Sequence, residues 1–233
     1  PPPRTDPVGS GAPGASAVTA TTSPLLAHDL ALGHPLVAGA DEAGRGCLAG
    51  PIVAAAVCFD LLALSPDAMS DLAALNDSKR LTARRRAALV GVVMRHARQV
   101  VVVSASARTI DAHGLHVTNM RVMRDAIAAI SPAPGVALVD GFDLGPDAPP
   151  HRRLVKGDAT SAAVAAASVI AKESRDRLMR GPAAAAYPGY GFEGHVGYIT
   201  AAHTEAVQRL GPCPLHRRSF RSSAYGDDLT LFE

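Results

Sequence analysis

The chain has 233 residues, of which 48% are hydrophobic and 19% are charged, and its formal net charge at pH 7 is +2. A chain of this length and apolar content can bury one sizeable core, which excludes a fibre and a fully disordered chain. The small net charge does not by itself indicate a nucleic-acid-binding protein. Basic residues nevertheless cluster in 79–86, 152–156 and 217–221, and each cluster is either a phosphate-binding surface or an ordinary solvated face.

The three cysteines and the apolar runs bear on the compartment. Cys47, Cys58 and Cys213 form no C-x-x-C pair, so neither a disulfide framework nor a structural zinc site is expected. A reducing cytoplasm is the expected location. The longest mostly apolar run, 162–171, is too short to span a bilayer. We therefore expect no membrane helix.

The N-terminal segment differs in composition from the rest of the chain. Residues 1–23 are rich in Pro, Gly, Ser, Thr and Ala and lack the basic start and apolar centre of a secretory signal. We predict a disordered or loosely ordered leader over 1–30, one folded domain over 31–221 and a flexible tail over 222–233.

In chain order, the hydrophobic patterns predict strands over 35–40 and 51–59, helices over 66–75 and 82–98, a strand over 100–103, a helix over 115–130, strands over 135–139 and 154–157, and helices over 160–179 and 200–210. Ser65 and Thr82 are the expected caps of the first two helices. The Ala-rich helix over 160–179 has a thin surface that allows close approach to a sheet. We predict a break at Pro182. The alternation indicates an α/β fold, with a mixed sheet and helices on both faces.

Four acidic residues come where predicted strands end: Asp41 and Glu42 after the first strand, then Asp140 and Asp158. Taken singly, each has an ordinary explanation as a loop, turn or helix-capping residue. Together they predict a single site, because ligand crevices in α/β sheets lie beyond the strand ends. Four clustered carboxylates repel one another without cations, and their oxygen atoms suit Mg²⁺ or Mn²⁺. Two such ions about 4 Å apart would support hydrolysis of a phosphodiester.

The first acidic pair poses a geometric problem. Neighbouring residues of a regular strand point to opposite faces, so Asp41 and Glu42 face one site only if the strand ends or bends there. Gly44 and Gly46 follow directly and tolerate unusual backbone angles. We therefore predict that the strand ends or bends at Asp41 and Glu42, although an ordinary Gly-Arg-Gly loop would also fit.

Several motifs, in this order and spacing, resemble those of the type 2 ribonuclease H family. They are Asp-Glu-Ala-Gly-Arg-Gly at 41–46, Asp-Ser-Lys at 77–79 with Leu81, Val-Asp-Gly at 139–141, Lys-Gly-Asp at 156–158, Ala-Ala-Ala-Ser-Val-Ile-Ala-Lys at 165–172 with Arg175-Asp176, Gly-Tyr at 197–198 and His-Arg-Arg-Ser-Phe at 216–220. The resemblance covers about residues 35–220. Gly114 departs from it, because an Asn is common at that position.

The resemblance implies a ribonuclease H-like fold, with a central five-stranded mixed sheet flanked by helices and a helical C-terminal portion. The domain over 31–221 is then the catalytic domain, and Asp41, Glu42, Asp140 and Asp158 are its catalytic, metal-binding acids for two Mg²⁺ or Mn²⁺ ions. The implied reaction is endonucleolytic hydrolysis of the RNA strand of RNA/DNA hybrids, and incision 5′ of ribonucleotides embedded in duplex DNA. It leaves 3′-hydroxyl and 5′-phosphate ends and serves ribonucleotide excision and RNA primer removal.

The same resemblance implies roles for substrate-binding residues. The backbone of Gly44, Arg45 and Gly46 would read the 2′-hydroxyl, which separates RNA from DNA, and Tyr198 would pack on the sugar of the next deoxynucleotide. An unplaced Tyr is otherwise a half-buried core residue. Contacts to backbone phosphates are expected from Lys79, Arg80, Lys172 and Arg218. Asp176 fits a structural partner of a neighbouring base.

The last residues of the chain suggest a further partner. Residues 228–232 resemble peptides that dock on the sliding clamp, so Leu229 to Phe232 are a candidate clamp contact; the alternative is a tail that folds back on the body. We expect a monomer.

Two other functions are less well supported by the sequence. A non-catalytic hybrid-binding module would gain nothing from four clustered carboxylates. A small-nucleotide phosphotransferase would be expected to have a G-x-x-x-x-G-K-[ST] loop, which this sequence lacks.

Overall fold

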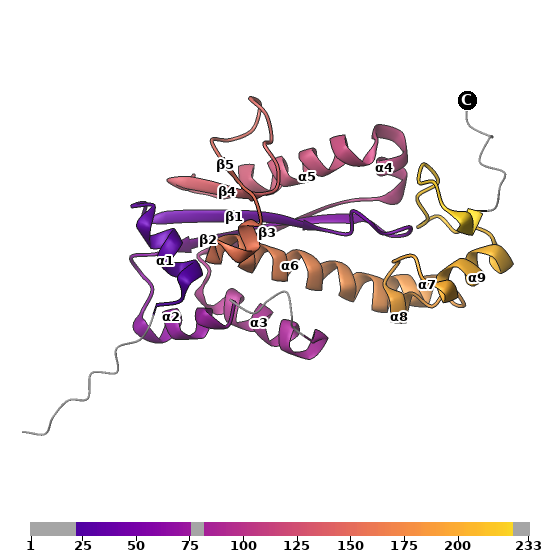
Figure 1. Ribbon diagram of the computed structural model, residues 1–233, viewed down its shortest axis with the longest axis horizontal. Helices are drawn as coiled ribbons and strands as arrows, with labels where there is room; N and C mark the ends of the chain where they lie inside the picture. The colour runs from indigo at the N-terminus through magenta and orange to yellow at the C-terminus, as the bar shows by residue number, and fades with distance from the viewer. Residues whose placement is uncertain (1–21, 76–81, 226–233) are drawn as a thin grey trace, which may run out of the picture.

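The computed structural model describes residues 22–75 and 82–225. Its centre is a five-stranded sheet in the order β3-β2-β1-β4-β5 (Figure 1). The strands are β1 Leu36–Ala43, β2 Ile52–Asp60, β3 Gln99–Ala105, β4 Val136–Asp140 and β5 Arg152–Leu154. β1 and β3 pair antiparallel to β2, whereas β4 runs parallel to β1 and to β5. The sheet is therefore mixed, and the predicted α/β fold is confirmed.

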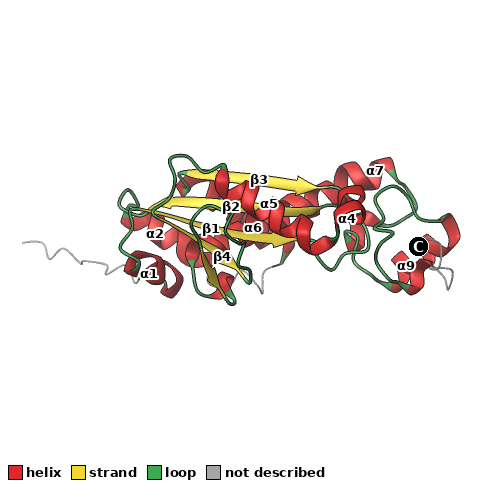
Figure 2. Ribbon diagram, turned by 90° about the horizontal axis from the view of Figure 1, so that it is seen from above, coloured by secondary structure: helices red, strands yellow, loops and turns green. Residues whose placement is uncertain are grey.

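Helices cover both faces of the sheet (Figures 1 and 2). They are α1 Pro24–Ala31, α2 Pro66–Leu72, α3 Ala83–His96, α4 Ala107–His113, α5 Leu115–Ala128, α6 Ala162–Leu178, α7 Ala184–Ala186, α8 Phe192–His195 and α9 Ala201–Leu210. α5 packs on one face and α6 on the other, with α1 and α3 against α6. The short helices α7 and α8 and helix α9 form the end of the molecule beyond the sheet. In the described part of the chain, none of these helices has the length and apolar character needed to span a membrane.

α6 is the central buried helix that the sequence predicts. Its residues from Ala162 to Ala167 are all buried, and Ser161 caps it by accepting a hydrogen bond from the Val164 amide. The backbone of α6 lies so close to β1 that a Cβ atom at Gly39 would collide with Ala163. Small residues on both elements thus allow the approach.

The alternation along β1 divides the core in two. Val37 and Ala43 lie in the cluster between the sheet and α6. Ala38 and Ala40 lie in the cluster between the sheet and α5. Even-numbered residues of β1 therefore face α5 and odd-numbered residues face α6, as the two-residue period of a strand requires.

The structure corrects the predicted leader boundary at residue 30. Residues 24–31 form α1, which begins at Pro24 after the capping residue Ser23 and buries Leu25 and Leu26. Asp29 is also buried, and it accepts a hydrogen bond from the Ala163 amide at 2.9 Å. The composition of the preceding segment hid a short helix whose stability comes from packing against α6.

Two further expectations are wrong. The strand predicted over 154–157 lies earlier, at Arg152–Leu154. Pro182 does not end the Ala-rich helix, because a π turn over Met179–Ala183 carries the chain on into α7. α4 and α8 were not predicted. By contrast, Ser65 and Thr82 cap α2 and α3 as expected, and Cys47, Cys58 and Cys213 are free and buried.

Candidate active site

The first acidic pair lies inside β1 rather than after it. Asp41 is paired with Ala55 of β2, and Glu42 is paired with Ala54. The prediction that the strand ends or bends at this pair is therefore wrong: β2 is long enough to keep β1 in regular register through Ala43. The two side chains consequently belong to opposite faces of the sheet.

Each acid meets a polar side chain of the helix on its own face. Asp41 faces α6, where Ser168 is close enough to lower the carboxyl pKa through a hydrogen bond. Glu42 faces α5, where the nearby amide of Asn119 also lowers the carboxyl pKa, although the amide atoms of Asn119 form no hydrogen bond of ordinary geometry. Neither Ser168 nor Asn119 was singled out from the sequence, because only the packing of α5 and α6 places them beside the acids.

Asp140 joins Asp41 through the parallel pairing of β4 with β1. The last paired residues are Ala40 and Val139, so Asp41 and Asp140 come next on adjacent strands. The carboxylate of Asp140 accepts a hydrogen bond from the amide of Gly157. This bond ties the end of β4 to the turn that carries the fourth acid.

Asp158 lies in a 3-10 turn over Gly157–Ala159 and is buried. The sequence predicted that Asp158 ends a strand, and this is wrong. Asp158 also does not cap α6, because Ser161 has that role. Lys156, just before the turn, has a φ of 56°, in the left-handed region. This sharp change of direction follows β5 and leads the chain toward Asp140.

Burial and mutual repulsion weaken the acidity of the first pair. Burial raises the pKa of Asp41 to about 8, the Ser168 hydrogen bond opposes this, and the charges of Glu42 and Asp140 raise it further. Burial also raises the pKa of Glu42 to about 7, against the attraction of Arg45. The environment of Asp41 and Glu42 therefore disfavours negative charge on both carboxyls, and the charge of Asp140 contributes to this in each case.

These residues fit a hard divalent cation by donor type. One carboxylate oxygen of Glu42, Oε2, is buried without a hydrogen-bond partner, and a buried unpaired oxygen is costly unless a cation or donor meets it. In residues 22–75 and 82–225, however, no three Asp, Glu, His or Cys side chains are gathered closely enough to hold a metal. Asp41 and Glu42 start from opposite faces of β1, yet the charge of Asp140 acts on both carboxyls, and a site shared by all four acids stays a prediction.

Two buried arginines hold the turn over 44–51 that follows β1. The guanidinium groups of Arg175 and Arg217 both donate to the carbonyl oxygen of Pro51, at 3.0 and 3.1 Å. Arg217 also donates to the carbonyl oxygen of Arg45 at 3.0 Å. Both side chains are fully buried. The sequence marked these arginines only as parts of motifs, and their function as backbone clamps depends on contacts across more than a hundred residues.

Tyr198 lies beside the same turn. The carbonyl oxygen of Gly197 accepts hydrogen bonds from the amides of Leu48 and Ala49, at 2.9 and 3.2 Å. The Tyr198 side chain is 39% exposed, and its ring lies 4.8 Å from the ammonium of Lys172. Tyr198 is therefore a partly exposed surface residue, joined through backbone bonds to the turn that holds Gly44, Arg45 and Gly46.

The basic residues predicted to contact phosphate fall in different settings. Lys172 donates to Asp176 at 2.8 Å, and Asp176 is also paired with Arg86 and Arg180. The prediction that Asp176 is a structural partner of a neighbouring basic side chain is confirmed. Arg218 is exposed. Lys79 and Arg80 lie outside the described residues, as does the whole Asp-Ser-Lys motif at 77–79.

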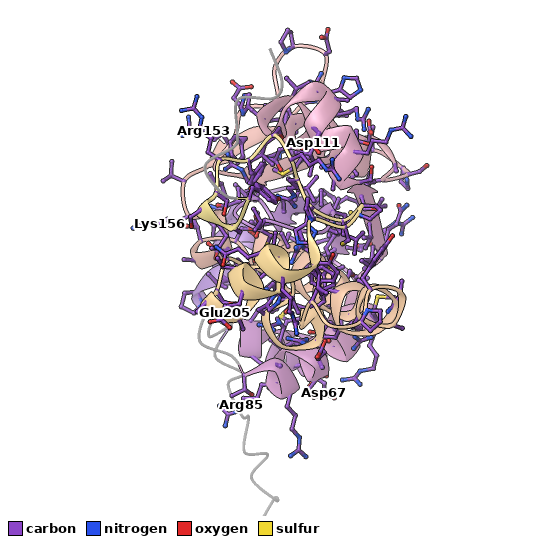
Figure 3. The ribbon with its side chains drawn as sticks, turned by 90° about the vertical axis from the view of Figure 1, so that its right-hand side faces the viewer. Asp67, Arg85, Asp111, Arg153, Lys156 and Glu205 are labelled. Atoms are coloured by element: carbon purple, nitrogen blue, oxygen red, sulfur yellow. The ribbon has the colours of Figure 1, made fainter. Side chains whose placement is uncertain are left out.

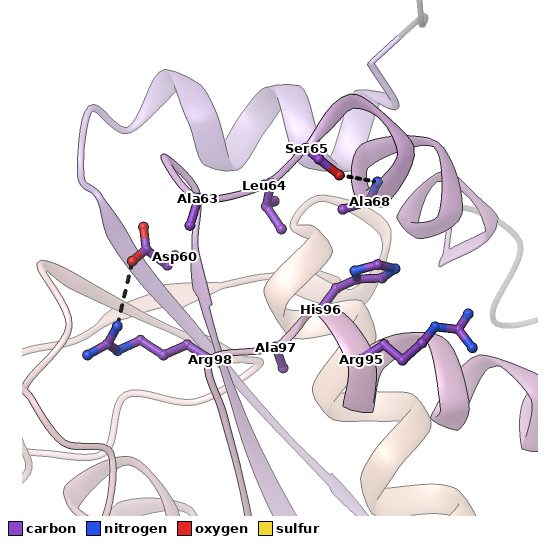
Figure 4. A pocket seen from close by; sticks show the side chains of 9 residues that line it. All are labelled: Asp60, Ala63, Leu64, Ser65, Ala68, Arg95, His96, Ala97 and Arg98. Atoms are coloured by element: carbon purple, nitrogen blue, oxygen red, sulfur yellow. Dashed lines mark hydrogen bonds and ion pairs between the residues drawn. The ribbon is translucent and has the colours of Figure 1, made fainter.

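Two other features lie away from the acids. Arg153 and Lys156 project from the same side of the molecule in the view onto its helical end (Figure 3). A cavity of about 330 Å³ is lined by Asp60, His96 and Arg98, among others (Figure 4). Asp60 ends β2, whereas the acids pair near the start of β2, so this cavity is at the opposite end of the sheet.

A five-stranded mixed sheet flanked by helices, with Asp41 and Asp140 on its adjacent parallel strands beside a tightly held turn, is the arrangement of a ribonuclease H-like fold. The model of the Ribonuclease HII family matches residues 38–223, and the chain belongs to this family. Ribonuclease HII of Mycobacterium avium (strain 104) is 50% identical over 184 residues, which cover 79% of this chain and 77% of the relative. The protein of Mycobacteroides abscessus is 47% identical over 196 residues, covering 83% and 81%.

Solved structures agree with the fold. Ribonuclease H2 from Pyrococcus horikoshii OT3 superposes with a TM-score of 0.68 at 25% identity, over 82% of this chain and 95% of that chain. Ribonuclease HII of Archaeoglobus fulgidus, solved in a complex with PCNA, has a TM-score of 0.66 at 24% identity, over 80% and 96%. The family membership makes the chain an enzyme, a metal-dependent ribonuclease H.

Proposed function

We propose that this enzyme hydrolyses the RNA strand of RNA/DNA hybrids, and that it incises 5′ of ribonucleotides embedded in duplex DNA to leave 3′-hydroxyl and 5′-phosphate ends. One observation carries the proposal. The carboxyls of Asp41, Glu42 and Asp140 act on one another electrostatically, and burial disfavours charge in the first two; they lie next to a turn whose amides bond to Gly197, the neighbour of Tyr198. Ribonucleotide excision and removal of RNA primers are the processes that such a reaction serves.

Asp41, Glu42, Asp140 and Asp158 are the residues that would hold two Mg²⁺ or Mn²⁺ ions. When bound, the ions supply an activated water and stabilise charge on the leaving oxygen. Asp41 comes next to Asp140 across β1 and β4 and is the best placed to serve both ions. The repulsion from Glu42 and Asp140, which contributes to the raised pKa of Asp41, is what a bound cation would offset.

The turn over 44–51 supplies the recognition of RNA. Gly46 is exposed, and a Cβ atom there would meet no other group, so the backbone is open to the close approach of a sugar. Arg45 is partly exposed, with its guanidinium 4.7 Å from the Phe142 ring, and can reach a phosphate. Because Arg175 and Arg217 fix the carbonyl groups of this turn, its backbone is preorganised to test for a 2′-hydroxyl.

Tyr198 supplies the test for the next sugar. Its partly exposed ring is held from behind by Lys172, and its backbone is fixed beside the turn by Gly197. A deoxyribose packs on an aromatic ring more closely than a ribose, whose hydroxyl must be desolvated. This arrangement supports cutting at an RNA-to-DNA junction. Lys172 and Arg218 remain proposed phosphate contacts, as do Lys79 and Arg80.

The proposal is tested with matched duplexes that carry zero, one or four ribonucleotides, incubated in Mg²⁺ or Mn²⁺. We expect cutting of the second and third duplexes, metal dependence, and no cutting of the first. Mass spectrometry of the products should find a 3′-hydroxyl and a 5′-phosphate. Binding of the hybrid without strand scission in either metal would instead favour a non-catalytic binding module.

The C-terminal segment is a second proposed contact. Leu229 to Phe232 lie outside the described residues, and the Archaeoglobus relative was solved with PCNA. We propose that this segment docks on the sliding clamp, and that the enzyme acts as a cytoplasmic monomer. A labelled peptide of residues 224–233 should show saturable fluorescence anisotropy with the clamp. A fluorescence anisotropy that does not change as clamp is added would contradict the proposed contact.

A further inference from the structure

Asn119 is a buried polar residue that the proposed chemistry has not yet used. It lies on α5 and is fully buried, and neither its Oδ1 nor its Nδ2 atom makes a hydrogen bond of ordinary geometry. Buried side-chain amides are normally paired, because an unpaired donor or acceptor keeps its full cost of desolvation. Because an unpaired buried amide destabilises the fold, we looked for a functional role for Asn119.

The packing of α5 places Asn119 over the end of β1. Asn119 is one helical turn before Val122 and Met123, which pack with Ala40 in the core cluster on this face of the sheet. Glu42 comes two residues after Ala40 and faces the same way. The amide of Gly135 donates to the carbonyl oxygen of Leu36, so the chain leaving α5 returns to the start of β1. The first turns of α5 therefore lie over the C-terminal end of β1, which carries Glu42.

Glu42 is also incompletely paired. Its Oε2 atom is buried without a partner, and its Oε1 atom is 3.8 Å from Nε of Arg45, the edge of ion-pair distance. The Asn119 amide is close enough to lower the pKa of this carboxyl. Two buried groups of complementary polarity thus face each other, with neither fully satisfied.

We infer that Asn119 is a positioning residue for Glu42, whose amide N–H group orients the carboxylate so that one oxygen is presented to a divalent cation. The inference rests on the proposed function, in which Glu42 is a metal ligand. Groups that orient a metal ligand through a hydrogen bond commonly contribute 10- to 100-fold to metal affinity or activity.

Three variants separate this role from a structural one. Asn119→Leu keeps the approximate volume and removes both polar atoms. Asn119→Asp keeps the shape and the acceptor but lacks the N–H group. Thr118→Val is the matched control, because the Thr118 hydroxyl is also buried and unpartnered, one residue away and facing no acid identified in the site. The melting temperature with EDTA, the rise in melting temperature on adding Mg²⁺, and the cutting rate are measured for each.

Asn119→Leu is expected to raise the metal-free melting temperature by about 2–4 °C, since it removes an unsatisfied buried amide. It should also need about 10-fold more Mg²⁺ for the same thermal shift, and cut about 10- to 100-fold more slowly. Asn119→Asp should lose at least as much rate. Thr118→Val should match the gain in stability while its rate and Mg²⁺ response stay at the wild-type level.

A destabilised Asn119→Leu protein with an unchanged Mg²⁺ response would overturn the inference, because Asn119 would then be structural. Wild-type cutting by Asn119→Asp would overturn the donor role. If the wild-type protein cuts no duplex, the proposed function fails, and the Mg²⁺-dependent thermal shift still decides the role of Asn119. Activity and metal binding thus give separate answers.

Discussion

Replacing Asp41 with Asn should stabilise the metal-free protein while destroying its activity. The pKa of Asp41 is raised from 3.8 to about 8 by burial and by neighbouring acids. The folded state therefore holds the Asp41 proton more tightly than the unfolded state does, and folding stability falls as the pH rises from 3.8 toward 8. An Asn side chain has nearly the same shape but no proton to lose.

The size of the effect follows from the two pKa values. Each pH unit between them corresponds to about 1.4 kcal/mol, so the Asp41 contribution to instability grows by at most about 4 kcal/mol between pH 5 and pH 8. Glu42, whose pKa is raised from 4.5 to about 7, also lowers folding stability as the pH rises, and it does so in both the wild-type and the Asp41→Asn protein. The difference in stability between Asp41→Asn and wild type should therefore increase with pH.

Urea unfolding in EDTA at pH 5, 6.5 and 8 measures this difference directly. Asp67→Asn is the control for loss of a carboxylate, since Asp67 is exposed in the first turn of α2. The reasoning is refuted if the Asp41→Asn protein is no more stable than wild type at pH 8, or if the difference between them is the same at pH 5.

Three other substitutions test the clamped turn and its neighbour. Gly46→Ala meets no group in the fold, so it should leave the melting temperature unchanged yet slow the cutting of a single ribonucleotide about 10-fold or more; normal cutting would show that the turn does not approach the sugar. Arg217→Lys cannot keep all the carbonyl contacts, and urea unfolding should show a loss of about 2–4 kcal/mol, a prediction that unchanged stability contradicts. Tyr198→Ala should retain the melting temperature and reduce the preference for duplexes with one ribonucleotide over those with four, measured as a ratio of kcat/KM; an unchanged ratio excludes the junction role.

Local patterns in the sequence were enough to predict much of the fold. Apolar runs located β1, β2 and β4, and capping residues such as Ser65 and Thr82 marked helix starts, because these signals act within a few residues. The helix α1 was missed, since its stability comes from burying Leu25 and Leu26 against a distant helix. The continuation of β1 through Asp41 was missed for a similar reason, because the pairing with β2 decides it.

The geometry of the candidate site could be predicted only in part. Motif order pointed to the four acids as candidates, and parallel pairing of β1 and β4 brings two of them, Asp41 and Asp140, next to each other. The separation of Asp41 and Glu42 onto opposite faces depends on strand register, which a run of residues does not reveal. Arg175, Arg217 and Asn119 act through contacts that exist only after the helices pack, so residue type alone gave no signal for them.

The central claim, that the acids at the end of the sheet perform the cut while other groups bind the duplex, is tested most directly by Asp140→Asn. Single-turnover cutting of a duplex with one ribonucleotide should fall at least about 100-fold in Mg²⁺, while the duplex Kd changes less than about threefold, with Asp67→Asn behaving as wild type in both assays. Loss of binding with an unchanged single-turnover rate would contradict the account.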